Sequence, residues 1–80
     1  MQSTHAADRS REAGLAAVCA AIEAVTGRRP EPGDRLEADL AIDSLELAAI
    51  AAAVPFDLNA RLAGFDFERL VSLTVAELVP

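Results

Sequence analysis

The sequence predicts an all-α fold: a small bundle of three main helices with one or two short helical turns inserted. Apolar residues recur at spacings of three and four, the period of one helix face, over 10–26 and 44–53. Glycine and proline punctuate the chain at Gly27, Pro55 and Gly64, where helices end or turn. Eighty residues form one domain with a small core.

The first helix is expected to begin after a polar, mobile leader over 1–9, with residues 10–80 forming the folded domain. Asp8 or Ser10 is suited to cap this helix, which runs to Thr26. Gly27 then fits the left-handed position that follows a helix. The apolar stripe of the helix is Leu15, Val18, Ile22 and Val25.

A long irregular segment over 28–43 is expected next, because its prolines and Gly33 oppose a helix. It nevertheless carries three large aliphatic residues, Leu36, Leu40 and Ile42. Loops of this length are usually functional or held by their own side chains. We therefore expect these three residues to anchor the loop to the core.

The second helix is predicted from Ser44 to about Ala53, because Pro55 opposes its continuation. Leu47, Ile50 and Val54 lie on one face of it. Asp43 or Ser44 stands where a side-chain oxygen caps the first free N–H groups.

Three shorter elements complete the prediction. Asp57 is expected to cap a helical turn over 58–63, and Asp66 another over 67–71. Thr74 and Glu77 have the spacing of a capping box, which predicts a final helix of about five residues. Val75, Leu78 and Val79 are expected to face the core.

Composition narrows the classes of function and partner. A net charge of −6 argues against nucleic acids and anionic membranes, and favours partners with basic surfaces. Cys19 is the single cysteine, so no internal disulfide forms, which suits a reducing compartment. No segment resembles a signal peptide or a membrane span. We expect a cytoplasmic monomer.

The sequence does not predict an enzyme. Nucleophilic catalysis needs a base beside the nucleophile, but the only histidine is His5, in the leader, and lysine and tyrosine are absent. No cysteine and histidine cluster predicts a metal site. Asp39, Asp43 and Glu46 lack the spacing of a calcium loop and are interpreted as a solvated acidic face.

The segment from Leu36 to Leu47 reads Leu-x-x-Asp-Leu-x-Ile-Asp-Ser-Leu-Glu-Leu. It resembles the modification segment of acyl carrier proteins, and the resemblance extends over about Ser10–Val79. It implies that Ser44 carries a covalent 4′-phosphopantetheine arm. A phosphopantetheinyl transferase would attach the arm, and acyl-loading and acyl-processing enzymes would use the thioester formed on its thiol.

One departure from that family concerns docking. Its members usually carry several acids along the exposed face of the second helix, whereas alanines stand here. We therefore expect a free-standing carrier for polyketide or related specialised-metabolite biosynthesis. Docking is expected to depend on apolar contact from Leu45 and Phe56, with Asp43 and Glu46 setting orientation. Phe56 follows Pro55 and could equally fold into the core.

Two alternatives stay open on the sequence alone. The first is a carrier for amino acids in nonribosomal peptide assembly, although glycine usually precedes the serine in those proteins. The second is an acidic protein-interaction module in which Ser44 is only a helix cap.

Overall fold

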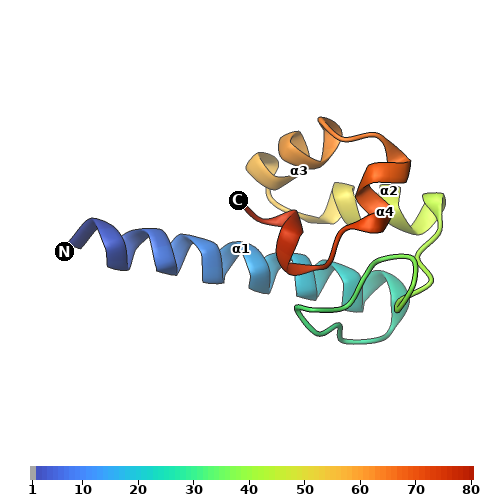
Figure 1. Ribbon diagram of the computed structural model, residues 1–80, viewed down its shortest axis with the longest axis horizontal. Coiled ribbons are helices and arrows are strands. Elements are labelled where there is room, and N and C mark those ends of the chain that lie inside the picture. The colour runs from blue at the N-terminus through green and yellow to red at the C-terminus, as the bar shows by residue number, and fades with distance from the viewer. Residues whose placement is uncertain (1) are drawn as a thin grey trace.

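The protein is an all-α globule. Its computed structural model describes the backbone of residues 2–80 and the side chains of residues 9–80. The elements in chain order are α1 (Gln2–Thr26), α2 (Ser44–Ala53), α3 (Phe56–Ala63), α4 (Phe67–Ser72) and the 3-10 helix η1 (Ala76–Leu78). Residues 27–80 pack around the C-terminal half of α1, whose N-terminal half extends away from them (Figure 1). This confirms the predicted fold class.

The first helix is longer than the sequence predicted. It begins at Gln2, so the prediction of a start capped by Asp8 or Ser10 is wrong. The polar sequence of 2–9 gave no apolar periodicity, which is why the helix was not detected there. The expected mobility of the leader stays a prediction, and the side chain of His5 lies outside the described ones.

Two later elements also differ from prediction. α3 begins at Phe56 with Pro55 as its N-cap, so Asp57 lies in its first turn and does not cap it. Pro55 fits this position because its φ of −58° lies in the range that the proline ring fixes, and because a residue before the helix needs no N–H for a helical hydrogen bond. The final element is the three-residue η1, shorter than the expected helix, although Val75, Leu78 and Val79 are buried as predicted.

Several local predictions are confirmed. α2 spans Ser44–Ala53. The carboxylate of Asp66 caps α4, with its Oδ1 accepting a hydrogen bond of 2.9 Å from the Arg69 N–H. Gly27 adopts φ 79° beyond α1, in the left-handed region that glycine tolerates best.

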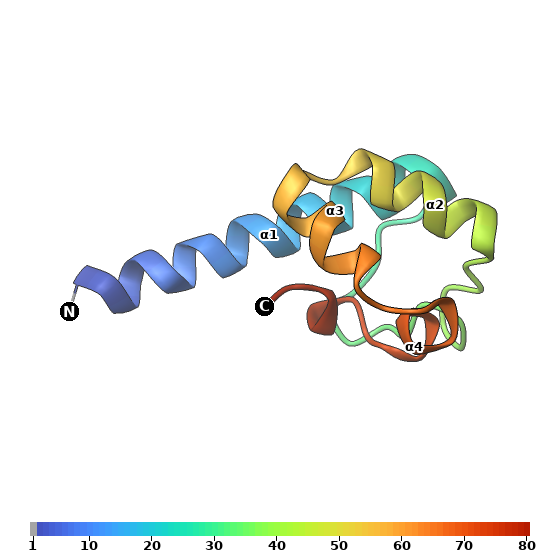
Figure 2. The same ribbon diagram turned by 90° about the horizontal axis from the view of Figure 1, so that it is seen from above.

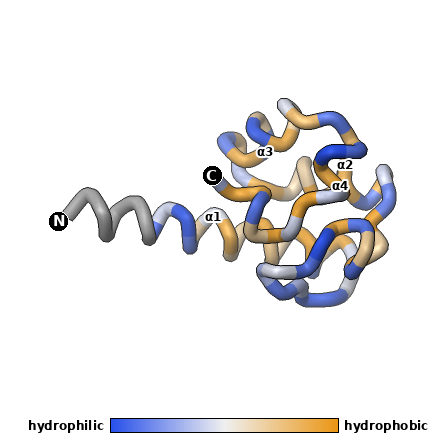
Figure 3. Tube along the Cα trace, in the orientation of Figure 1, coloured by the Kyte–Doolittle hydropathy of each residue, from blue (hydrophilic) through white to orange (hydrophobic). Residues whose placement is uncertain are grey.

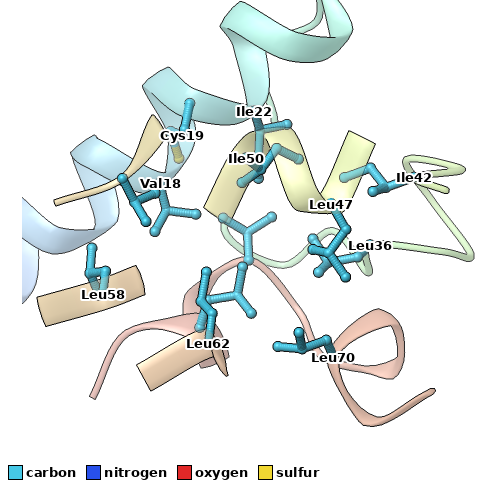
Figure 4. Close-up of a cluster of buried hydrophobic side chains, with 14 of the residues drawn as sticks. Val18, Cys19, Ile22, Leu36, Ile42, Leu47, Ile50, Leu58, Leu62 and Leu70 are labelled. Carbon is cyan, nitrogen blue, oxygen red and sulfur yellow. The ribbon is translucent and has the colours of Figure 1, made fainter. Parts of the chain in front are cut away.

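One continuous core joins all these elements (Figure 4). It contains Val18 and Ile22 of α1, Ile50 of α2 and Leu62 of α3, each at most 2% exposed. No polar or charged residue among the described side chains is buried. Burying a large aliphatic side chain contributes roughly 1.5–3 kcal/mol relative to leaving it exposed, so this cluster supplies most of the favourable free energy of folding.

The long loop is ordered by two kinds of contact. Leu36, Leu40 and Ile42 are buried, as predicted. In addition, backbone hydrogen bonds pair the loop with the chain after α4: the Leu36 N–H donates to the Leu73 carbonyl at 3.2 Å, and the Val75 N–H donates to the Asp34 carbonyl at 2.9 Å. This pairing joins residues distant in sequence, so no local pattern predicts it. The loop passes from the end of α1 to the start of α2 beside α4 (Figure 2).

Arginines hold the C-terminal segment in place. Arg11 donates to the Pro80 carbonyl at 2.7 Å, Arg61 to the Leu78 carbonyl at 3.0 Å, and Arg35 to the Ser72 carbonyl at 3.3 Å. Gly14 allows Val79 to pack closely against α1, because a Cβ at position 14 would lie only 2.8 Å from Cγ1 of Val79. The end of the chain is thus fixed against α1 and α3.

Candidate functional site

The start of α2 is positioned by the loop that precedes it. Leu40 and Ile42 are buried on either side of Ala41, whose φ of 54° lies in the left-handed region. That conformation is uncommon for a residue other than glycine, and it turns the chain sharply toward α2. The Ile42 N–H donates to the Leu36 carbonyl at 2.9 Å and closes the turn. Ser44 therefore follows a fixed turn.

Asp43, not Ser44, caps α2. Its Oδ1 accepts a hydrogen bond of 2.8 Å from the Glu46 N–H, and Oε1 of Glu46 accepts one of 3.2 Å from the Asp43 N–H. The two residues thus form a reciprocal capping box. The interpretation of Ser44 as only a helix cap is therefore wrong. The sequence left the choice open because both aspartate and serine are favoured caps.

Ser44 is the first residue of α2, and its side chain is exposed. Among the described side chains, its hydroxyl makes no hydrogen bond. The partial positive charge of a helix N-terminus attracts phosphate groups, and free N–H groups there can donate to them. The site therefore presents an unengaged hydroxyl on a rigid helix start.

An apolar groove of about 270 Å³ opens beside Ser44 between α2, α3 and α4. Asn59 lines the groove, and its Nδ2 donates a hydrogen bond of 2.7 Å to the Ala51 carbonyl, which links α3 to α2. Phe67, at the start of α4, is 41% exposed. The groove is lined by Ser44, Leu47, Ala48, Ala51, Asn59, Leu62, Ala63, Phe67 and Leu70.

Sequence reasoning did not anticipate this groove. Leu62 and Leu70 carry the apolar signal of their helices, but nothing local indicates that they line one groove together with Leu47. The small side chains of Ala48 and Ala51 provide the space.

The predicted docking residues differ in their exposure and in their distance along the chain from Ser44. Leu45 is 81% exposed and Phe56 is 82% exposed, so Phe56 does not fold back into the core. Asp43 and Glu46 both lie at the same helix start as Ser44, but their carboxylates accept backbone hydrogen bonds in the capping box. Phe56 stands at the start of α3, at the opposite end of α2.

No group of three histidine, cysteine, aspartate or glutamate side chains gathers in a way that could hold a metal ion within the described residues. Cys19 is a free thiol buried in the core, as expected for a small hydrophobic residue. None of the helices in the described part of the chain is long and apolar enough to cross a membrane.

Comparison of the chain with models of known protein families, with curated proteins and with solved structures found no match. A functional hypothesis for this protein therefore rests on its own residues and geometry.

Proposed function

We propose that this protein is an acyl carrier protein in which Ser44 bears a 4′-phosphopantetheine arm. The observation that carries the proposal is that the helix cap and the exposed hydroxyl at the start of α2 belong to different residues. Asp43 and Glu46 satisfy the capping hydrogen bonds, so the exposed Ser44 hydroxyl has no role in the fold. A modification there would leave the helix intact.

The surroundings of Ser44 fit a phosphate ester. The N-terminus of α2 favours a negative group, and the exposed side chain leaves space for a transferase to approach. Attachment would break the Ser44 O–H bond and form an Oγ–P bond with phosphopantetheine from coenzyme A. Adenosine 3′,5′-bisphosphate would leave, and a base of the transferase would take the proton. When attached, the arm supplies a thiol that holds an acyl group as a thioester.

The role of the chain itself would be to present Ser44 and its arm to other enzymes. The core contacts of Leu47 and Ile50 fix α2, and the capping box fixes its first turn, so Ser44 is held in a defined direction. Acyl chemistry would then take place in partner enzymes. The alanines on the exposed side of α2 support a dedicated polyketide or related specialised-metabolite pathway as the setting, because the usual row of docking acids is missing.

The decisive experiment is co-expression with a broad-specificity phosphopantetheinyl transferase followed by intact-mass measurement. We expect one phosphopantetheine per wild-type chain and none on Ser44→Ala. Ser72→Ala is a matched control, because Ser72 is also exposed but its hydroxyl already donates to the Arg69 carbonyl at 2.7 Å. A modified Ser44→Ala protein, or an unmodified wild type while a known carrier is modified in the same cells, would refute the proposal.

A further inference from the structure

One arginine contact lies outside the C-terminal segment, in the loop just before the start of α2. Arg28 follows α1, and its Nη2 donates a hydrogen bond of 2.9 Å to the carbonyl of Leu40, twelve positions later. Among the hydrogen bonds of the described residues, this is the only one that the Leu40 carbonyl accepts. The contact therefore links the end of α1 to the part of the loop that leads to Ser44.

Arg28 is itself held in a fixed direction. Gly27 turns the chain at the end of α1 with its φ of 79°, and its N–H donates to the Glu23 carbonyl at 2.8 Å. The Arg28 N–H donates to the hydroxyl of Thr26 at 3.2 Å, and that hydroxyl donates to the Ile22 carbonyl at 2.8 Å. Because the backbone of Arg28 is tied to the last turn of α1, its guanidinium reaches the loop from a rigid base.

The contact holds the peptide unit between Leu40 and Ala41. The carbonyl of this unit accepts from Arg28, and its N–H donates to the Glu37 carbonyl at 3.0 Å, so both of its polar groups are engaged. Leu40 and Ile42 are anchored in the core on either side, so a change of Ala41 from its φ of 54° to a negative φ would require this peptide unit to rotate. The hydrogen bond from Arg28 therefore favours the left-handed conformation of Ala41, which alanine adopts only at an energetic cost.

We propose that Arg28 is a positioning residue for the attachment of the arm to Ser44, because it stabilises the turn at Ala41 that sets the direction in which α2 begins. The inference rests on the proposed function. A transferase needs the Ser44 hydroxyl in one geometry, and a turn that is formed only part of the time lowers the apparent affinity by the fraction of competent molecules. Arg28 acts through the Leu40 carbonyl and not through the reacting atoms.

The first measurement is the kinetics of arm transfer to the full chain by a broad-specificity phosphopantetheinyl transferase. Arg28→Gln should raise the KM for this chain about three- to tenfold, the factor that corresponds to one hydrogen bond of ordinary net strength. The kcat should stay within about twofold of wild type, because the competent form itself is unchanged. Arg29→Gln is the matched control, because it removes the same charge from the next residue, whose Nη1 pairs with Oε1 of Glu23 at 3.2 Å.

A rescue experiment separates this role from a general effect on stability. Glycine adopts a positive φ without the steric cost that a Cβ causes. Adding Ala41→Gly to Arg28→Gln should therefore return the KM to within about twofold of the wild-type value. Ala38→Gly in the same background should leave the KM raised. Ala38 is also an exposed alanine of this loop, but Ala41 is the only residue other than glycine with a positive φ in the described part of the chain.

Amide hydrogen exchange on the unmodified proteins provides a readout that needs no transferase. The N–H groups of Ala41 and Ile42 donate to the carbonyls of Glu37 and Leu36 within this turn. Their exchange should become about three to ten times faster in Arg28→Gln. It should return toward the wild-type rate when Ala41→Gly is added, and Arg29→Gln should leave it unchanged.

The outcomes distinguish this inference from the proposed function. If the wild-type chain is modified but Arg28→Gln keeps the wild-type KM, the inference is overturned and the proposed function stands. An equal rise of KM for Arg29→Gln, rescue by Ala38→Gly as well as by Ala41→Gly, or unchanged exchange in Arg28→Gln would overturn it in the same way. A wild-type chain that takes up no arm would instead overturn the proposed function, and with it the role of Arg28 in attachment.

Discussion

Leu40 and Leu45 lie five residues apart, and the structure uses them in opposite ways. Leu40 belongs to an irregular loop and is 7% exposed, whereas Leu45 belongs to a regular helix and is 81% exposed. The hydropathy of the two neighbouring segments can be followed along the chain trace (Figure 3). In this molecule, therefore, a residue in a helix does not necessarily contribute to the core, and a residue in an irregular loop can do so. The loop packs into the core, whereas one side of α2 stays exposed.

The largest effect that tests this comparison is expected in the loop. Leu36→Ala should lower the free energy of unfolding by about 2–5 kcal/mol, because its side chain is fully buried and the substitution leaves a cavity. Leu45→Ala should change it by less than about 0.5 kcal/mol, the range of exposed positions. Urea unfolding followed by circular dichroism measures both. Equal losses for the two variants would show that loop and helix do not differ in this way.

An intermediate effect is expected where loop and helix meet. Asp43→Ala removes the side chain that caps α2 and should destabilise the protein by about 0.5–2 kcal/mol. The same urea measurement applies, and Asp43→Asn is the control because asparagine also caps helices. If Asp43→Ala were as stable as wild type, another group would have to satisfy the first turn of α2.

A smaller, pH-dependent effect is expected at the second capping box. The backbone N–H of Thr74, and then its hydroxyl, lower the pKa of Glu77 below its ordinary value of 4.5, with Arg35 and Arg69 adding to the shift. A lowered pKa in the folded state means that the ionised carboxylate stabilises the fold above 4.5 and that this contribution disappears as pH falls through the folded pKa.

Glu77→Gln should therefore be less stable than wild type near neutral pH, and the difference should shrink as pH falls below about 4.5. Thermal unfolding of both proteins between pH 7 and pH 3 measures it. Glu68→Gln, on the exposed surface of α4, is a suitable control. A difference between wild type and Glu77→Gln that stayed constant over this pH range would contradict the role given to this carboxylate.

The sequence predicted those parts of the fold that depend on local patterns. The limits of α2 follow from Asp43 and Pro55, and the cap of α4 follows from Asp66. The anchors of the loop were visible because large aliphatic residues are unusual in a proline-rich and glycine-rich segment. The N-terminal extension of α1 was missed because its polar residues have no apolar period.

Contacts between residues distant in sequence could not be predicted from local sequence patterns. The pairing of Asp34 and Leu36 with the chain after α4 joins residues about forty positions apart. The contact of Arg11 with the Pro80 carbonyl joins residues that are more distant still. At the candidate site, the position of Ser44 was predictable, but the choice between two possible caps needed three-dimensional geometry.

The most direct test of the central claim concerns Ser44, for which the smallest effect on stability is expected. If Asp43 alone caps α2, Ser44→Ala should leave the free energy of unfolding within about 0.5 kcal/mol of wild type, since the hydroxyl makes no hydrogen bond among the described side chains. Urea unfolding of unmodified Ser44→Ala beside Asp43→Ala decides the matter. A loss of about 1 kcal/mol or more for Ser44→Ala, with Asp43→Ala unaffected, would show that Ser44 is the cap and would contradict the account.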